Sequence, residues 1–140
     1  MGRHGRRPTE PTDGRLTSPH TSVDLFDTTQ TGLERALSGS ALRQQAIATN
    51  IANVNTPGYR RQDVDFQSAL QAAWTKGEAA VADTTSAISV DQTSVMRADG
   101  SSVDIDTEAA AQAKNGLQYE AISQVLKTRT SILRSAIGIA

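Results

Sequence analysis

The apolar side chains of this chain repeat with a helical period near each end. Between about residues 24 and 54 they recur at alternating steps of four and three, the spacing of a helix that packs along one seam. The seam of this first helix consists of Leu33, Leu37, Ser40, Gln44, Ile47, Ile51 and Val54. A wider stripe runs along a second helix, from about residue 106 to 137, through Ile122, Val125, Leu126, Ile132, Leu133, Ala136 and Ile137. Each helix therefore needs a partner for one apolar face.

Between the two long helices the pattern predicts a turn, a short helix and a flexible segment. The turn covers residues 55–62, because Pro57 and Gly58 suit the second and third positions of a type II turn. A short helix over about residues 65–76 has an apolar face at Phe66, Ala69, Leu70, Ala73 and Trp74. Residues 77–103 show no sustained period, so a flexible loop or a weak hairpin around 87–97 is expected there.

These elements predict an all-α fold with one domain over residues 23–140. Its two long helices bury their stripes most simply by pairing as an antiparallel, coiled-coil-like hairpin. Residues 1–22 hold three of the four prolines, both histidines and a single aliphatic side chain. We expect a disordered leader there, because such a segment cannot offset its ordering entropy. The leader is either a genuine extension or a misassigned start, with Val23 as the true first residue.

Composition limits the size of the core that the chain can build. Hydrophobic residues make up 37% of the 140 positions and aromatic residues 4%, which is below the usual share of a globular domain. Two paired helices cannot bury all of their aliphatic side chains, whereas ordering each residue costs on the order of 1.5 kcal/mol. We therefore expect the isolated monomer to be marginally stable and assembly to complete its core.

Charge and composition also narrow the class of protein. A net charge of −1 argues against a nucleic-acid binder, which needs a basic face to neutralise phosphates. The chain has no cysteine, which excludes disulfides and thiolate metal sites. No segment approaches the roughly 20 apolar residues of a membrane helix, and no apolar stretch follows the basic N-terminus as in a secretory signal. From the residues alone, a cytosolic protein without membrane insertion is expected.

Residue types that commonly carry catalysis or metal binding are poorly placed for either role. Both histidines lie in the predicted leader, which leaves a catalytic triad without a credible base. The pairs Asp63/Asp65 and Asp104/Asp106 each precede a predicted helix, where Asp is a favoured N-cap, and Asp106 is the expected cap of the last helix. We therefore predict no enzyme, and no catalytic, cofactor or metal site.

A long motif at the end of the first helix carries a family resemblance. Ala46–Tyr59, with the sequence AIATNIANVNTPGY, resembles the N-terminal signature of the flagellar rod, hook and hook-associated proteins. The next run, Arg60–Phe66 or RRQDVDF, is similar, together with Leu70, to the FlgB-type family of flagellar basal-body rod proteins, the proximal rod type.

The second half of the chain agrees with this resemblance. Asp99-Gly100, followed by Val103–Asp106 and Glu108, looks like the family's entry to its C-terminal helix. Two departures are Ser101, where the family usually has Asn, and the pair Ala109–Ala110, where it usually has a bulkier residue. The resemblance covers roughly residues 24–75 and 97–138.

The resemblance implies a structural subunit of the flagellar rod, needed for motility. Such a subunit leaves the cytoplasm through the flagellar type III export apparatus, without a cleaved signal, and lies in the basal body on the periplasmic side of the inner membrane. Its partners would be itself, other rod and basal-body subunits and the export apparatus. The residues expected in its core or interfaces are Leu33, Leu37, Ile47, Asn50, Ile51, Asn53, Asn55, Pro57, Gly58, Tyr59, Phe66, Ile122, Leu126, Leu133 and Ile137.

The asparagines of the motif are unexpected in a helix, because Asn competes for nearby backbone groups. We expect the amides of Asn50 and Asn53 to pair with neighbouring subunits and so to fix register, at some cost in stability. Arg60 and Arg61 are either a solvated pair or contacts to acidic groups of a neighbour.

Two alternatives stay open at this point. One is a different axial rod subunit, such as the adjacent proximal one. The other is a soluble coiled-coil adaptor or export chaperone, which would need helices that are stable in isolation.

Overall fold

The computed structural model describes residues 21–136 and 138, with side chains described from Thr28 onward. Predictions for His4, His20 and most of the leader, and for Ile137, lie outside the described residues. In the described part the elements are α1 (Thr21–Ala52), β1 (Gln62–Asp63), α2 (Phe66–Trp74), α3 (Glu78–Ala82), β2 (Ser89–Val90) and α4 (Ile105–Ala136). The predicted all-α class with long terminal helices is confirmed, since both strands are only two residues long.

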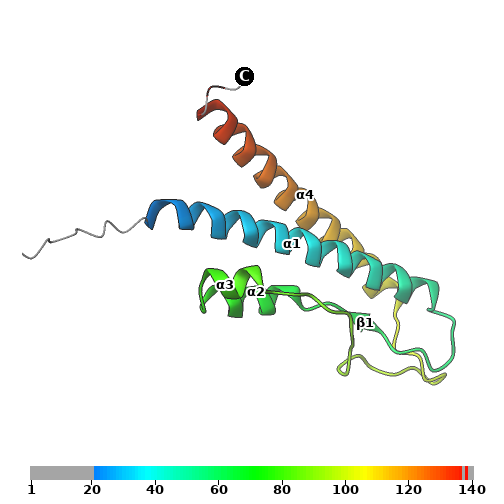
Figure 1. Ribbon diagram of the computed structural model, residues 1–140. Coiled ribbons are helices and arrows are strands. Elements are labelled where there is room, and N and C mark those ends of the chain that lie inside the picture. The colour runs from blue at the N-terminus through cyan, green and yellow to red at the C-terminus, as the bar shows by residue number, and fades with distance from the viewer. Residues whose placement is uncertain (1–20, 137, 139–140) are drawn as a thin grey trace, which may run out of the picture.

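α1 and α4 are antiparallel and pack against each other, as predicted, but over only part of their length. Figure 1 shows them crossing near the end of α1 and the start of α4, and diverging toward their other ends. Ile47, in the second half of α1, is almost fully buried, whereas Leu133 near the end of α4 is 48% exposed. The pair therefore has a closed end, where the helices meet, and an open end, where they separate.

Two glycines of α1 allow α2 to lie directly along it. A Cβ added at Gly39 would lie 2.4 Å from Cγ of Phe66, and one at Gly32 would lie 2.4 Å from Cζ3 of Trp74. Glycine weakens a helix by about 1 kcal/mol relative to Ala. Packing explains both residues, because any larger side chain at these positions would displace an aromatic ring of α2.

Residues 77–103 contain α3 and β2. The sequence shows no sustained period there and predicted neither element. Val81 of α3 is fully buried, and Arg35 of α1 donates to the carbonyl of Ala82 at the end of α3. β2 pairs antiparallel with β1, with Gln62 opposite Val90. The partner of this strand lies before α2, so the ladder is not the local hairpin considered for residues 87–97.

The helix boundaries differ from the predicted ones by a few residues. α1 begins three residues before the predicted start at 24 and ends two residues before the predicted end at 54. α4 is capped by Asp104, not by Asp106, because Oδ1 of Asp104 accepts from the backbone N of Asp106 at 3.1 Å. Asp65 caps α2, as one of the two candidates, by accepting from the backbone N of Ser68 at 3.2 Å.

The predicted type II turn is present after α1. The backbone N of Tyr59 donates to the carbonyl of Thr56 at 3.2 Å, and Gly58 has a φ of 74°, a conformation that favours glycine. The backbone N of Gly58 also donates to the carbonyl of Asp99 at 3.1 Å. This contact joins the turn to the segment that enters α4.

The core of the described residues is small. Its main cluster is built from Ala46, Val64 and Phe66, with Ala36 and Leu42 packed against it. The guanidinium of Arg43 lies 4.9 Å from the centre of the Phe66 ring and donates to the carbonyl of Val64, so it covers this cluster. Among the described residues, no helix has the length and hydropathy needed to span a membrane.

A candidate assembly surface

Asn50 is the centre of a polar layer at the closed end of the helix pair. Its side chain is fully buried, and its amide uses all of its hydrogen-bonding positions. Nδ2 donates to the carbonyl of Gln62 at 2.7 Å and to Oε2 of Glu108 at 3.0 Å. Oδ1 accepts from the backbone N of Gln62 at 2.9 Å and from the hydroxyl of Tyr59 at 3.3 Å. Asn50 thereby joins α1 to β1 and to α4 within one chain.

Glu108 is the charged member of this layer and is completely buried. Nε of Arg61 donates to Oε1 of Glu108 at 2.6 Å, so the buried carboxylate has a paired charge. Burial lowers the pKa of Arg61, but the hydrogen bonds and charges of Glu108, Asp91 and Asp63 together outweigh burial, and the net pKa is raised. Burial, and then the charge of Glu108, raise the pKa of the Tyr59 phenol.

Asp91 ties the loop after β2 to the same layer. Its Oδ1 accepts from the backbone N and the hydroxyl of Thr93, at 2.8 and 2.6 Å. Its Oδ2 accepts from the hydroxyl of Ser94 at 2.6 Å and from a terminal nitrogen of Arg61 at 2.8 Å. The hydrogen bonds from Ser94 and Thr93, and then the one from Arg61, hold the pKa of Asp91 well below its usual range.

A second polar layer lies seven residues further along α4, at Asn115. This side chain is 2% exposed and faces the two polar positions of the predicted seam, Ser40 and Gln44. Nδ2 of Asn115 donates to the carbonyl of Ser40 and to Oε1 of Gln44, both at 3.0 Å. Its Oδ1 accepts from the hydroxyl of Ser40, also at 3.0 Å. The polar members of the seam are thus satisfied by α4 of the same chain.

The charged groups in these layers bind one another. The carboxylates of Glu108 and Asp91 are both paired with Arg61. In the described part of the chain, no group of three or more His, Asp or Glu side chains could hold a metal ion. The layers therefore act as joints that set where α4 lies on α1.

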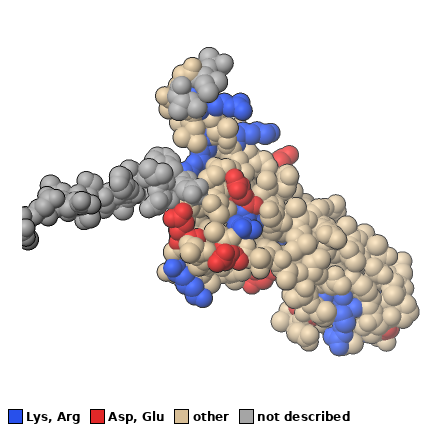
Figure 2. Space-filling model, in the orientation of Figure 1, with Lys and Arg blue, Asp and Glu red and all other residues tan. Residues whose placement is uncertain are grey.

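The open end presents apolar surface where the closed end presents polar joints. Val125, Ile132 and Leu133 of α4 are 51%, 63% and 48% exposed. A cleft of about 540 Å³ lies between these residues and Thr29 of α1. Figure 2 shows one face of the molecule, with charges of both signs scattered over it and Lys and Arg side chains near the free end of α4. Val125, Ile132 and Leu133 thus form an exposed apolar stripe on the outer half of α4.

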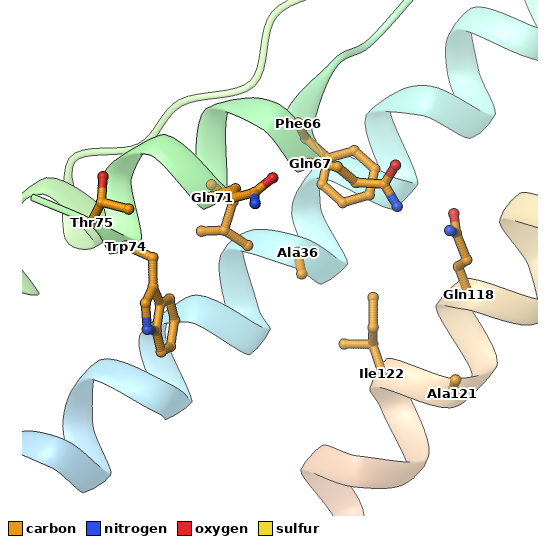
Figure 3. A pocket seen from close by; sticks show the side chains of 10 residues that line it. Ala36, Phe66, Gln67, Gln71, Trp74, Thr75, Gln118, Ala121 and Ile122 are labelled. Carbon is orange, nitrogen blue, oxygen red and sulfur yellow. The ribbon is translucent and has the colours of Figure 1, made fainter. Parts of the chain in front are cut away.

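A second apolar cleft, of about 590 Å³, opens between α2 and α4 with α1 as its floor (Figure 3). Phe66 and Trp74 form one wall, Ile122 forms the other, and Ala36 lies at the floor. The polar side chains that line it are all uncharged, namely Gln67, Gln71, Thr75 and Gln118. We call this space the α2–α4 cleft.

The predicted core and interface residues fall into three groups by exposure. Buried are Ile47, Asn50 and Phe66. Half-buried are Leu33, Leu37, Ile51, Asn53, Tyr59, Ile122 and Leu126. Exposed are Asn55, Pro57, Gly58 and Leu133.

The structure corrects the expectation that the amide of Asn50 pairs with a neighbouring subunit. Its four hydrogen bonds all lie within the chain, because a buried amide must be satisfied where it is. The amide of Asn53 also bonds locally: Nδ2 donates to the carbonyl of Thr49 at 2.8 Å and Oδ1 accepts from the hydroxyl of Thr56 at 3.2 Å. The motif thus folds its own chain at the end of α1.

Sequence reasoning did not single out Glu108 as the partner of Asn50, nor Asn115 as the partner of Ser40 and Gln44. The available signal was their spacing, since Glu108, Asn115 and Ile122 follow one another at seven-residue steps on the stripe of α4. A polar residue at a seam position of one helix predicts a polar partner on the facing helix. Ser40 and Gln44 are the polar residues of the first seam, and they are the partners of Asn115 on the facing helix.

Comparisons with known proteins agree with the motif and extend beyond it. Residues 33–60 match the family model described as flagella basal body rod protein. The chain is 31% identical to the flagellar basal body rod protein FlgB of Escherichia coli (strain K12), over 81% of this chain and 98% of that protein. It is also 31% identical to FlgB of Bacillus subtilis (strain 168), over 82% of this chain and 97% of that protein. FlgB of Salmonella typhimurium is 32% identical over 70% of this chain and 84% of that protein.

Proposed function

Because the chain belongs to the FlgB-type family of flagellar basal body rod proteins, we propose that it forms the proximal part of the rod and assembles through the open end of its helix pair. Membership of this family makes the chain a structural subunit of the basal body, which assembles with other rod and basal-body subunits. The proximal position, the periplasmic side of the inner membrane and the need for motility are parts of the proposal.

The observation that carries the proposal is the exposed apolar stripe on the outer half of α4. Val125, Ile132 and Leu133 have about half or more of their surface in water. Burying one such side chain is worth about 1.5–3 kcal/mol. Neighbouring subunits that cover the stripe would therefore complete a core that the single chain leaves open.

The closed end supports this assembly by fixing the direction of α4. The Asn50–Glu108 layer and the Asn115 layer hold the first ten or so residues of α4 at one register on α1. Polar layers of this kind set register in helical assemblies. The register expected between subunits would thus be set first within each subunit.

We further propose that the chain leaves the cytoplasm through the flagellar type III apparatus in an unfolded form. The small core supports this, because only Ala46, Val64 and Phe66 form its main cluster. A protein with so little buried apolar surface needs little work to unfold. The sequence also has no cysteine, so no disulfide has to be opened.

A charge on the stripe tests assembly without disturbing the monomer. We expect Leu133→Asp to abolish incorporation into basal bodies, because an assembled interface would bury the new carboxylate without a partner. Since Leu133 is half exposed in the single chain, the helix content of the purified variant should match that of the wild type. The measurement is the amount of the chain in basal bodies isolated from cells that lack the native copy.

Ser131→Asp is the matched control, because it adds the same charge two residues away at another exposed position of α4. It should assemble normally. Incorporation of Leu133→Asp at the wild-type level would refute the assignment of the stripe as an assembly surface. Full swimming of cells that lack the chain altogether would refute the rod function itself.

A further inference from the structure

The Asn115 layer contains the one asparagine of the chain that is followed by glycine. Asn50, Asn53 and Asn55 precede Ile, Val and Thr, whereas Asn115 precedes Gly116. An asparagine loses its amide when the backbone nitrogen of the next residue attacks its side-chain carbonyl carbon. Glycine favours this attack, because it has no Cβ to hinder the approach and its backbone reaches more conformations than that of other residues. Asn115 is therefore the most labile asparagine of the sequence.

The reaction at such a site is a deamidation that consumes only water. The backbone N of Gly116 gives up its proton and bonds to Cγ of Asn115, the bond from Cγ to Nδ2 breaks, and ammonia leaves. The product is a cyclic succinimide. Water then opens this ring at either carbonyl carbon, which gives aspartate in one case and isoaspartate in the other. No oxidation or reduction takes place, so the step needs no partner beyond the solvent.

The folded chain holds Asn115 away from this reaction. Its side chain is 2% exposed, and Nδ2 donates to the carbonyl of Ser40 and to Oε1 of Gln44, both at 3.0 Å. Gly116 lies within α4, where helical geometry directs its backbone N toward the carbonyl four residues earlier. The attack therefore needs α4 to leave its helical geometry and the Asn115 layer to open.

Neither product fits the layer in which Asn115 lies. The amide donates to the carbonyl of Ser40, whereas a carboxylate at the same place has acceptor oxygens only and would face that carbonyl. Isoaspartate in addition inserts one carbon into the backbone of α4, which breaks the helical spacing. Because the site is almost fully buried, the new charge has little access to water. A chain that is modified while unfolded therefore returns to a less stable fold.

We propose that Asn115-Gly116 is a deamidation site that the polar contact between α1 and α4 protects, so that the chain is modified there only while this contact is open. The rate in the folded chain is then the rate in the unfolded chain multiplied by the open fraction. The inference goes beyond the proposed function, because the reaction needs no assembly. Together with unfolded export, it means that the time spent unfolded limits the share of chains that still form the Asn115 layer.

Peptide mass spectrometry of the purified full-length chain tests the site. The chain is incubated at mildly alkaline pH in native buffer and in guanidinium chloride, and the peptide that contains Asn115 is followed for the mass gain of an amide that becomes an acid. We expect the unfolded chain to deamidate there at least about tenfold faster, since an opening free energy of about 1.4 kcal/mol already gives that factor. Equal rates in the two conditions would overturn the proposal.

Gly116→Ala is the matched control for the role of glycine. It keeps Asn115 and adds only a methyl group, at a position where no atom beyond the helix turn lies within 4 Å. In guanidinium chloride, this variant should deamidate at Asn115 at least several-fold more slowly than the wild type. Asn55 is an internal control, because it is exposed in the folded chain but precedes Thr56. If Asn55, or Asn115 in the variant, reacts as fast as Asn115 of the wild type, the assignment of the site is wrong.

Two further variants test the protection and its consequence. Asn50→Leu removes a hydrogen bond between α1 and α4 and leaves Asn115 in place. In native buffer it should speed deamidation about tenfold for each 1.4 kcal/mol of stability lost, with no change in guanidinium chloride. Asn115→Asp carries one product from the start and should have a lower urea midpoint than the wild type. An unchanged native rate in the first variant would refute the protection, and an unchanged midpoint in the second would refute the consequence.

All of these outcomes are measured on the purified chain, so they are independent of the rod function. If cells without the chain swim normally, the proposed function fails and the deamidation site stands. If the purified chain deamidates equally fast when folded and unfolded, the deamidation proposal fails and the rod function stands.

Discussion

Asn50 shows how one polar side chain can organise the joint between three elements. It lies on α1, and its amide bonds the backbone of Gln62 on β1 and the carboxylate of Glu108 on α4. An apolar residue at this place would remove the hydrogen bonds to Oε2 of the buried Glu108 carboxylate and to two backbone groups of Gln62. At the residue scale, the helix propensity that Asn loses is offset by the groups that it satisfies.

Replacing Asn50 by Leu is expected to lower the free energy of unfolding by about 3 kcal/mol, because Glu108 and Gln62 lose hydrogen bonds in a buried site. Asn53→Leu is the comparison, since Asn53 is half-buried and its amide bonds only to Thr49 and Thr56, which are close to it in the chain. That change should cost less than about 1 kcal/mol. Urea unfolding followed by circular dichroism measures both. Equal losses in the two variants would contradict the central role of Asn50.

Asp91 gives stability a defined dependence on pH. Its pKa in the folded chain is lowered by hydrogen bonds from Ser94 and Thr93 and by Arg61, so the folded state favours the charged carboxylate. This contribution is present above the unfolded pKa of about 3.9 and is lost as the pH falls from there toward the folded pKa. We expect the urea midpoint of the wild type to decline between pH 5 and pH 3.

Asp91→Asn isolates this contribution. The variant should have a lower urea midpoint than the wild type at pH 7. The difference between the two midpoints should narrow as the pH falls below about 4, because the wild type then loses the stabilisation from the charged Asp91 carboxylate, which the variant lacks at every pH. The urea midpoint is measured for both chains across the same buffers. A gap that stays constant with pH would show that Asp91 does not titrate as the structure implies.

At the scale of elements, the glycines of the two long helices differ in what surrounds them. Gly39 meets the Phe66 ring of α2, and Gly32 meets Trp74. Gly116, in the middle of α4, has no atom beyond its own helix turn within 4 Å of the position a Cβ would take. The same residue type therefore serves helix packing in α1 and has no packing role in α4.

The same substitution at two of these positions should act in opposite directions. Gly39→Ala is expected to destabilise the chain by about 1–3 kcal/mol, because Phe66 is buried and cannot move aside cheaply. Gly116→Ala should stabilise it by about 0.5–1 kcal/mol, since Ala forms helix better and fits the open space. Urea midpoints of the two variants measure the effect. A gain in stability at Gly39 would mean that α2 is not fixed on α1 as the structure has it.

The sequence predicted the elements that a local pattern of residues marks, and it missed those that depend on contacts between distant segments. The period of apolar residues predicted α1, α2 and α4, and Pro57-Gly58 predicted the turn after α1. β2 was not predicted, because its two exposed residues form no pattern of their own. They pair with β1, from which α2 and α3 separate them in the sequence. The polar layers were not predicted either, since Asn50 and Glu108 are far apart in the sequence and come into contact only in the folded chain.

At the scale of the whole molecule, the buried polar layers and the exposed apolar stripe lie at opposite ends of the helix pair. The closed end contains the buried polar layers and is complete within one chain. The open end leaves Val125, Ile132 and Leu133 in water. The core of the single chain is small because several of its apolar side chains lie on the surface. We propose that other subunits cover these side chains.

The spacing of the two polar layers also has a mechanical consequence. A pair of helices held only by an apolar stripe can slip along each other by one heptad, about 10.5 Å, and find a similar fit. Here such a slip would carry the buried carboxylate of Glu108 away from Asn50 and Arg61. Separating a buried charge from its partner costs about 3–5 kcal/mol. A load applied along α4 is therefore passed to the rest of the subunit, because α4 resists sliding under shear.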